Sequence, residues 1–189
     1  HRVKNNLQII SSLIDLQVSS VDEPQVIDLL FDSKNRIKAM ALIHQNLYQS
    51  PELAHIELKT YVNNLVTTLS QSFETDIHFN LSIEPLEIEI DQAVPIGLLI
   101  NELITNAIKH AFPSRKNGIV DIVASVHEEK ITLTISDNGV GLPKEFELEK
   151  SHSLGLKLVA ALCNQLNATL DISSRFSDTT FKIVAPIFK

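Results

Sequence analysis

Three residues, Glu102, Asn106 and Lys109, have side chains whose types and spacing suit them to chemistry. They stand at i, i+4 and i+7 in a segment, Asp91 to Ala111, whose apolar periodicity predicts a long helix, so they share one helix face within about 40°. A carboxylate, an amide oxygen and an ammonium group on one stripe suit a magnesium-bound nucleotide, because Mg²⁺ prefers hard oxygen ligands and phosphate attracts a positive charge. An ordinary solvated helix face has the same spacing. The opposite face is expected to lie on a sheet and carries Leu98, Ile104, Ala107, Ile108 and Ala111.

A second candidate is the segment Asp137-Asn138-Gly139-Val140-Gly141, which follows a predicted strand, Ile131 to Ile135. Its two glycines allow the backbone to approach a ligand closely, and a carboxylate at a strand end can accept a hydrogen bond from an amino group. Alone, this pattern is common in turns.

A third candidate is the segment Ser151 to Leu156, with Ser153, Leu154 and Gly155 at the predicted start of a helix. The unpaired backbone N–H groups and the positive end of the helix dipole make such a start a natural site for phosphate.

The first 50 residues predict two amphipathic helices joined by a turn near Pro24. In the first helix, apolar residues recur with the 4-3-4 spacing of a bundle seam, while polar residues form a separate solvent-facing stripe headed by His1. A hairpin of two helices is too thin to bury its seam alone, so we expect it to pair with a second copy or with the rest of the chain. The seam consists of Val3, Leu7, Ile10 and Ile14, widened by Ile9, Leu13 and Leu16, and the stripe of His1, Asn5, Gln8, Ser12, Asp15 and Ser19.

The remaining elements predict an α+β fold. A helix over 58–73, a strand over 77–83, the long helix, a β-hairpin over 120–135, a helix over 153–166 and two final strands imply a two-layer α/β sandwich with helices on one sheet face. We therefore divide the chain into a helical hairpin, 1–52, and a second domain, 53–189.

Composition excludes several classes of protein. The net charge is −7, from 16 basic and 23 acidic residues, without a long basic run, so nucleic acid is not an expected partner. Cys163, the single cysteine, is expected to be a small core residue. No apolar run reaches the ~18 residues of a membrane-spanning helix, so we expect a cytoplasmic segment, and its opening within a helical pattern predicts that a further segment precedes it.

Taken together and in this order, the three candidates resemble the N box and the two glycine boxes of the Bergerat (GHKL) ATPases. The segment Asn101 to Pro113, Asn-Glu-Leu-Ile-Thr-Asn-Ala-Ile-Lys-His-Ala-Phe-Pro, is similar to the N box of histidine kinases. The opening His1-Arg2-Val3-Lys4-Asn5-Asn6-Leu7-Gln8 resembles the phosphoacceptor helix of the HWE-like branch of sensor histidine kinases.

The resemblance implies an ATP site with these residue roles. Asn106 would ligate Mg²⁺, Lys109 and His110 would contact phosphates or ribose, and Asp137 would bind the adenine amino group. The pocket would be shaped by Gly139, Gly141 and Gly155, with Ser153 and Leu154 at the phosphate end and Thr179 near the adenine.

Three departures from the family pattern bear on these roles. Only Gly155 remains of the glycines usual in the second box, and Asp178 stands where glycine often precedes the threonine. Arg2 follows His1 where most sensor kinases have an acidic residue, so the general base must come from elsewhere, and Glu102 is the candidate.

The resemblance implies a protein-histidine kinase that phosphorylates His1 from Mg-ATP and passes the group to an aspartate of a response-regulator receiver domain. Asn5, one turn after His1, would position water for the reverse phosphatase activity. The expected partners are that receiver domain, an upstream sensor domain and a second copy bound through the hairpin. Two alternatives are an ATP hydrolase of the gyrase or Hsp90 kind, in which Glu102 would activate water, and a non-catalytic nucleotide-binding scaffold.

Overall fold

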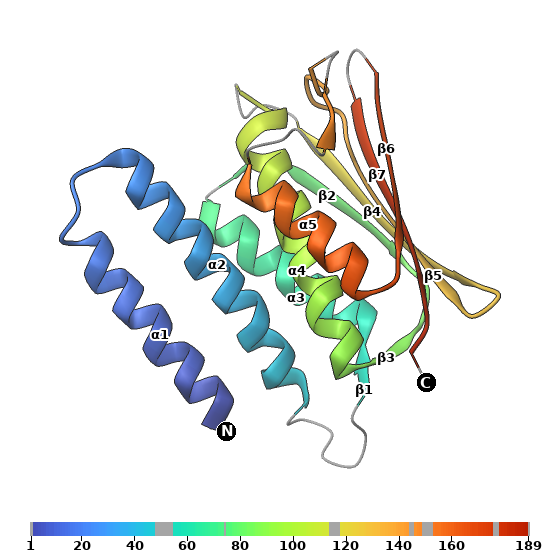
Figure 1. Ribbon diagram of the computed structural model, residues 1–189, viewed down its shortest axis with the longest axis horizontal. Helices are drawn as coiled ribbons and strands as arrows, with labels where there is room; N and C mark the ends of the chain where they lie inside the picture. The colour runs from blue at the N-terminus through green and yellow to red at the C-terminus, as the bar shows by residue number, and fades with distance from the viewer. Residues whose placement is uncertain are drawn as a thin grey trace.

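A helical hairpin opens the chain and a mixed α/β unit follows it in the computed structural model (Figure 1). The structure describes residues 2–47, 55–73, 75–113, 118–143, 146–148, 153–175 and 178–188. His1 lies outside the described residues. Within the described part of the chain, no helix is both long and apolar enough to cross a membrane.

The hairpin consists of α1, Arg2–Val18, and α2, Pro24–Leu47. Pro24 begins α2, at the position where a missing backbone N–H costs nothing. An ion pair between Asp15 and Lys34 joins the two helices, and Ile14 of the predicted seam is buried between them. The predicted hairpin is confirmed, and the polar stripe after His1 is exposed as expected.

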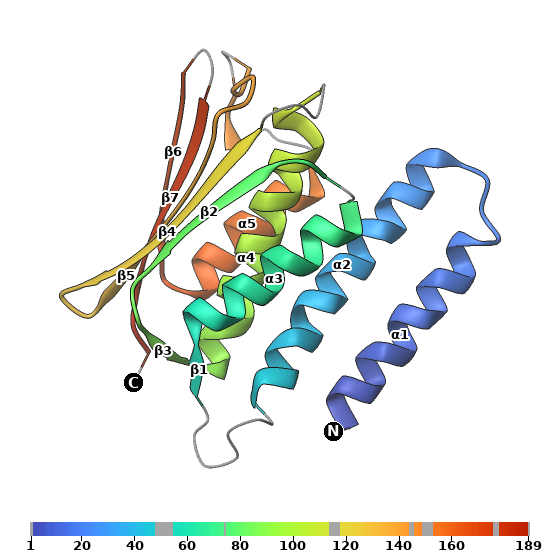
Figure 2. The same ribbon diagram turned by 180° about the vertical axis from the view of Figure 1, so that it is seen from behind.

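A five-stranded mixed sheet forms the opposite side of the molecule (Figures 1 and 2). Its order is β2 (His78–Ile83), β4 (Ile119–His127), β5 (Lys130–Asp137), β7 (Asp178–Pro186) and β6 (Thr169–Arg175). β2 runs parallel to β4, and the other neighbours are antiparallel. Along β5, buried residues alternate with more exposed ones, as the period-two pattern predicts.

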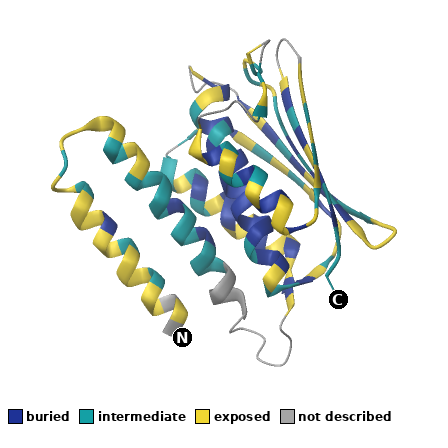
Figure 3. Ribbon diagram, viewed as in Figure 1, coloured by how far each residue is buried: buried dark blue, intermediate teal, exposed yellow. Residues whose placement is uncertain are grey.

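Three helices fill the space between the sheet and the hairpin: α3 (Leu58–Phe73), α4 (Ile90–Asn106) and α5 (Leu154–Gln165). α4 is the most deeply buried of them (Figure 3). Its residues Leu99, Ile100, Leu103 and Ile104 are almost inaccessible to solvent. α2 packs against α3 and α4, so the hairpin covers the outer side of this helical layer. Cys163 of α5 is buried as predicted, and burial raises the pKa of its thiol to about 11.

Two local features differ from the sequence-based expectation. β1 (His55–Glu57) and β3 (Glu87–Glu89) form a small antiparallel pair, which three-residue strands are too short to reveal by periodicity. The predicted long helix ends as an α-helix at Asn106, and its last turn, η1 (Ala107–Ala111), is a π-helix. Single π-turns within helices occur frequently at functional sites.

Candidate functional site

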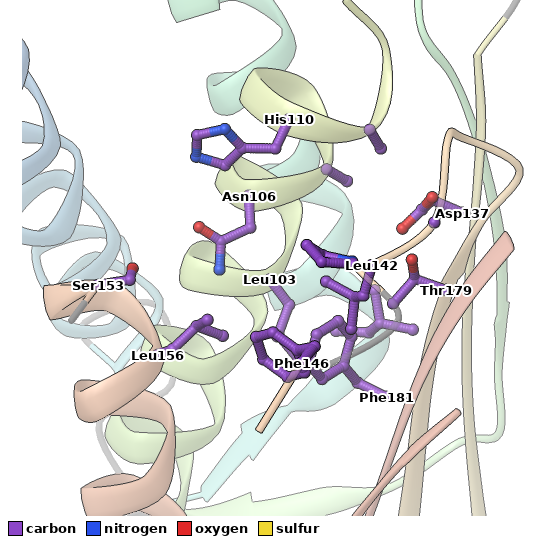
Figure 4. A pocket seen from close by; sticks show the side chains of 15 residues that line it. Leu103, Asn106, His110, Asp137, Leu142, Phe146, Ser153, Leu156, Thr179 and Phe181 are labelled. Carbon is purple, nitrogen blue, oxygen red and sulfur yellow. The ribbon is translucent and has the colours of Figure 1, made fainter. Parts of the chain in front are cut away.

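A cavity of about 470 Å³ opens where the end of α4, the end of β5, the first turn of α5 and the start of β7 converge (Figure 4). Its size is within the range of small-molecule and cofactor sites. It brings together Asn106, His110, Asp137, Gly141, Ser153 and Thr179 from the predicted site. Segments that lie far apart in the sequence, from Leu103 to Phe181, therefore meet at one cavity.

Asp137 and Thr179 lie side by side at one end of the cavity. They are cross-strand partners, the last residue of β5 opposite the second residue of β7. The backbone N–H of Gly139 donates a hydrogen bond of 2.9 Å to Asp137 Oδ1. Burial raises the pKa of Asp137, an effect that this hydrogen bond partly opposes and Asp178 reinforces. A half-buried carboxylate beside a buried threonine is suited to accept a hydrogen bond from the amino group of a heterocycle.

The glycine segment after β5 packs tightly against the end of η1. The backbone N–H of Val140 donates a 3.0 Å hydrogen bond to the carbonyl oxygen of Ala111. A Cβ atom on Gly139 would lie 2.4 Å from the Cβ of Ala111 and 2.5 Å from its carbonyl oxygen, so only glycine fits there. Gly141 has φ = 77°, in the region that glycine adopts without steric cost. The two glycines are thus required for different reasons, close packing and backbone conformation.

Asn106 ends α4 with its side-chain amide beside the cavity. Its Nδ2 is buried without a hydrogen-bond partner among the described residues, while its Oδ1 lies near the first turn of α5, 3.7 Å from where a Cβ of Gly155 would be. An orphaned buried amide is costly, so it fits a group that becomes satisfied when a ligand binds. Within the described ranges no cluster of three or more His, Cys, Asp or Glu side chains could hold a metal. A magnesium ion held mainly by nucleotide phosphates and one amide oxygen is compatible with that set of residues.

Glu102 and Lys109, predicted on the same face as Asn106, do not line the cavity. Glu102 is 3% exposed, and both of its carboxylate oxygens accept hydrogen bonds from Arg36 of α2, from Nε and from Nη2, each at 2.7 Å. Lys109 forms an ion pair with Asp32, which lies one turn before Arg36 on α2. The expectation that Glu102 points toward nucleotide phosphates therefore differs from the structure, because α2 packs on this face of α4 and supplies charged partners. Its proposed catalytic role stays a prediction.

The first turn of α5 forms the end of the cavity nearest Glu102. Ser153 lines the cavity just before the helix begins. A Cβ on Gly155 would lie 2.8 Å from Glu102 Oε2, so this glycine allows α5 to approach the carboxylate. Leu154 is 59% exposed and does not line the cavity.

The apolar part of the lining was missed by the reasoning from sequence. It comes from five different elements and loops, and each of its residues looks like an ordinary core residue in its own segment. No local pattern marks them, because only the tertiary arrangement brings them together. They are Leu103, Ile135, Leu142, Phe146, Leu156 and Phe181. Arg36, the partner of Glu102, was also missed.

The two hairpin residues of the predicted site lie apart from the cavity. His1 is outside the described residues. Asn5 is exposed on α1 and does not line the cavity.

Comparison with known proteins identifies the family. Residues 91–188 match the family described as "Histidine kinase-, DNA gyrase B-, and HSP90-like ATPase", and residues 1–73 match a histidine kinase family, HisKA_2. The chain belongs to the histidine kinases of this ATPase family. The resemblance seen in the sequence, including its HWE-like branch, is confirmed.

Two curated relatives are histidine kinases aligned over almost all of the chain. Sensor histidine kinase PdtaS of Mycobacterium tuberculosis is 32% identical over 97% of the chain, and blue-light-activated histidine kinase 2 of Erythrobacter litoralis is 30% identical over 99%. The chain spans 38% and 55% of the length of these two relatives.

A solved histidine kinase domain from Erythrobacter litoralis EL346 superposes with a TM-score of 0.79 at 24% identity, covering 98% of this chain and 95% of that chain. The predicted α+β fold, a helical hairpin followed by a sandwich of the histidine kinase type, is confirmed.

Proposed function

We propose that the chain is the catalytic core of a sensor histidine kinase, which phosphorylates His1 from Mg-ATP and passes the phosphoryl group to an aspartate of a response regulator. The observation that carries this proposal is the cavity in which Asn106, Asp137, Ser153 and Thr179 converge, in a chain whose first 73 residues match a histidine kinase family. The division into a phosphoacceptor hairpin, 1–52, and an ATP-binding domain, 53–189, is part of the proposal.

The cavity suits ATP in one orientation. Asp137 would accept a hydrogen bond from the adenine amino group, with Thr179 beside it, and the apolar lining would enclose the flat base. The phosphates would extend toward Asn106 and the first turn of α5, where unpaired backbone N–H groups favour negative charge. Asn106 Oδ1 would hold Mg²⁺, which neutralises phosphate charge when bound. His110 lines the cavity where it would contact ribose or phosphate.

The proposed reaction is an in-line phosphoryl transfer. A neutral imidazole nitrogen of His1 forms the new N–P bond, the bond from the γ-phosphorus to the bridging oxygen breaks, and ADP leaves with that oxygen. The imidazole proton passes to a general base, for which Glu102 is the candidate. The phosphohistidine then loses the group to a receiver-domain aspartate, and Asn5 would position water for the reverse phosphatase reaction.

The hairpin also supports a proposal about partners. Ile9, Leu13 and Leu16, one apolar stripe on the outer face of α1, are 60%, 54% and 67% exposed. We propose that a second copy covers this stripe and that a sensor domain precedes the chain in a protein that places this portion in the cytoplasm.

The direct test is incubation with ATP labelled at the γ-phosphate. We expect label on the protein that is stable in base and lost in acid, as phosphoramidates are. His1→Gln should abolish this label and keep ATP affinity within a few-fold, because His1 is an acceptor and not a ligand. Persistent labelling of the variant would move the acceptor to another histidine, with His44 the next to test. Free phosphate released without any protein-bound label would instead support the hydrolase alternative, and nucleotide binding without either product the scaffold.

A further inference from the structure

Two neighbouring ion pairs join α2 of the hairpin to the N-box helix, which consists of α4 and its last turn, η1. Arg36 binds Glu102 through two hydrogen bonds of 2.7 Å, and Asp32 binds Lys109. The side chains of Arg36 and Glu102 are 16% and 4% exposed, so this pair is well shielded from water. Asp32 and Arg36 are one turn apart on α2, which makes the two pairs a single two-point contact.

This contact holds two residues of the proposed ATP site away from the cavity. Glu102 Oε2 packs against Gly155 in the first turn of α5, beside the Oδ1 of Asn106. With both carboxylate oxygens bonded to Arg36, Glu102 has little capacity left to accept a proton from an incoming imidazole. Lys109 is likewise occupied by Asp32 and not directed at phosphates.

The same arrangement places the phosphoacceptor end of α1 far from the cavity. Asp15 of α1 forms an ion pair with Lys34, which is two residues before Arg36 on α2. Asp15 therefore lies beside the part of α2 that contacts Glu102. The helix runs from Asp15 back to Arg2 over 13 residues, and at 1.5 Å each Arg2 lies about 20 Å farther along the axis. Figures 1 and 2 show the start of α1 at the end of the hairpin opposite the first turn of α5. In a parallel pair of hairpins, the second copy's α1 would begin at the same distant end.

The interface between α2 and α4 also leaves buried polar atoms without hydrogen bonds, which is unfavourable for a permanent contact. Asn35 lies on the same side of α2 as Asp32, and Thr105 on the same side of α4 as Glu102. Both are buried, and the polar atoms of both side chains lack hydrogen-bond partners among the described residues. Each such buried group without a hydrogen bond destabilises the contact, and water would satisfy it if the helices separated. A contact built from ion pairs and orphaned polar groups is suited to open.

We propose that Asp32 and Arg36 form a latch that holds the hairpin on the N-box helix in a resting arrangement, and that the latch must open before the phosphoryl group reaches His1. The proposal rests on the proposed kinase function. Opening releases Glu102 and Lys109 toward the nucleotide and frees the hairpin to bring the start of α1 to the cavity. Anything that separates α2 from α4, including a force applied through the hairpin, would raise the rate of transfer.

The first experiment locks the latch without altering the proposed catalytic or binding residues. Lys38 of α2 donates a 3.2 Å hydrogen bond to Ser72 of α3, so Lys38→Cys with Ser72→Cys places two thiols where the hairpin meets the central helices, between α2 and α3 and outside the latch itself. The two thiols are joined by a short bis-maleimide linker whose internal disulfide can be cleaved by a reductant. The chain also carries Cys163→Ser, so that no other thiol reacts. We expect the linked chain to bind ATP within about threefold of the unlinked chain but to label at less than about one-tenth of its rate, and cleavage to restore labelling. Labelling of the linked chain at the unlinked rate would overturn the proposal.

The second experiment opens the latch. Fluorescent probes at Asp22 in the hairpin turn and Asp171 on β6 report the separation of hairpin and sheet in the nucleotide-free chain. Arg36→Gln and Asp32→Asn should each lengthen this distance and raise the labelling rate about threefold to tenfold. Lys34→Gln is the matched control, because it breaks an ion pair inside the hairpin and should leave the probe distance unchanged. Exchanging the charges, Asp32→Lys with Lys109→Asp, should restore the short distance.

These readouts separate the two proposals. If the wild-type chain labels no histidine, the proposed function fails, yet the probe distances still show whether the latch exists. If the chain labels but the distance and rate of both α2 variants equal those of the wild type, the latch is refuted.

Discussion

At the scale of single residues, the cavity owes its proposed selectivity to one carboxylate. Asp137 is placed by the end of β5 and oriented by the Gly139 N–H, and it is half-buried without a salt-bridge partner in the described residues. Burial raises its pKa, so the ionised form is held at a cost that a hydrogen-bond donor on a ligand would offset. The Asp137 carboxylate is therefore expected to contribute more to the free energy of ligand binding than to the free energy of folding.

Asp137→Asn should therefore weaken ATP binding about tenfold to a hundredfold while leaving the fold intact. The expected loss reflects a hydrogen bond to a charged acceptor, worth about 1.5–3 kcal/mol. Calorimetric titration with ATP measures the affinity, and thermal unfolding provides the control. An affinity equal to that of the wild type would remove Asp137 from the adenine site.

The same carboxylate gives a pH dependence with a defined sign. Because the folded-state pKa is raised, the stability contributed by Asp137 is present below the unfolded-state pKa of about 3.9 and is lost as pH rises through the folded value. At neutral pH Asp137→Asn should thus be no less stable than the wild type. ATP affinity should follow the opposite trend and fall as the pH is lowered through the raised pKa. Denaturant titrations and nucleotide titrations over the same pH range measure the two trends separately.

Glu102→Gln should lower the labelling rate about 10²- to 10⁴-fold, the usual contribution of a general base, with a much smaller change in ATP affinity. The ion pair with Arg36 makes a matched control necessary, since the substitution also weakens that contact. Arg36→Gln removes the same ion pair but leaves the carboxylate in place. If both variants lose activity equally, Glu102 is not the base, and its ion pair with Arg36 supports transfer in place of restraining it.

At the scale of elements, the π-turn η1 and the glycine segment after β5 form one wall of the cavity. The Val140 N–H bonds to the Ala111 carbonyl, and Gly139 fits against Ala111 with no space for a methyl group. This contact fixes the distance between the N box and the first glycine box.

Gly139→Ala should therefore displace the loop, destabilise the protein by about 1–3 kcal/mol and weaken ATP binding. Adding Ala111→Gly should not restore either property, because the Ala111 carbonyl oxygen, at 2.5 Å from the new Cβ, remains in conflict. Denaturant unfolding and nucleotide titration of the single and double variants measure both effects. Full rescue by the second substitution would show that only the two methyl groups conflict.

Elements with a strong local period were predictable from the sequence, and contacts between distant elements were not. The helix over Leu58–Phe73 and the β4–β5 hairpin match their predicted positions, because burial of one face imposes period 3.6 or period 2 on the residues. The π-turn has no such signature. The Arg36–Glu102 pair joins residues 66 positions apart, and Arg36 reads as an ordinary solvated residue on an amphipathic helix. The polar residues of the cavity were found because their family resemblance marks them, whereas its apolar lining was hidden among core residues.

At the scale of the whole molecule, the chain forms three layers: sheet, central helices and hairpin (Figures 1 and 2). The central helices are covered on both sides, but α1 touches the rest mainly through α2. Leu7 lines a groove with Ile37 and Ala41 of α2, and Ile14 is buried. Ile9, Leu13 and Leu16 recur at i, i+4 and i+7 on a different face that is open to solvent. An α-helix with two apolar faces is typical of a bundle with more than two helices.

Replacement of Leu13 and Leu16 by glutamate should therefore convert a hairpin-mediated dimer into monomers. Two charges on a stripe that packs against its own copy would each have to be buried without a partner, at a cost of several kcal/mol across a two-fold interface. Ser12→Glu, an exposed change on the neighbouring polar stripe, is the matched control and should leave the dimer intact. Sedimentation velocity over a range of concentrations measures the oligomeric state, and thermal unfolding shows whether each protomer remains folded. A wild-type chain that stays monomeric at all concentrations, or a double variant that still dimerises, would assign the outer face of α1 to a different partner.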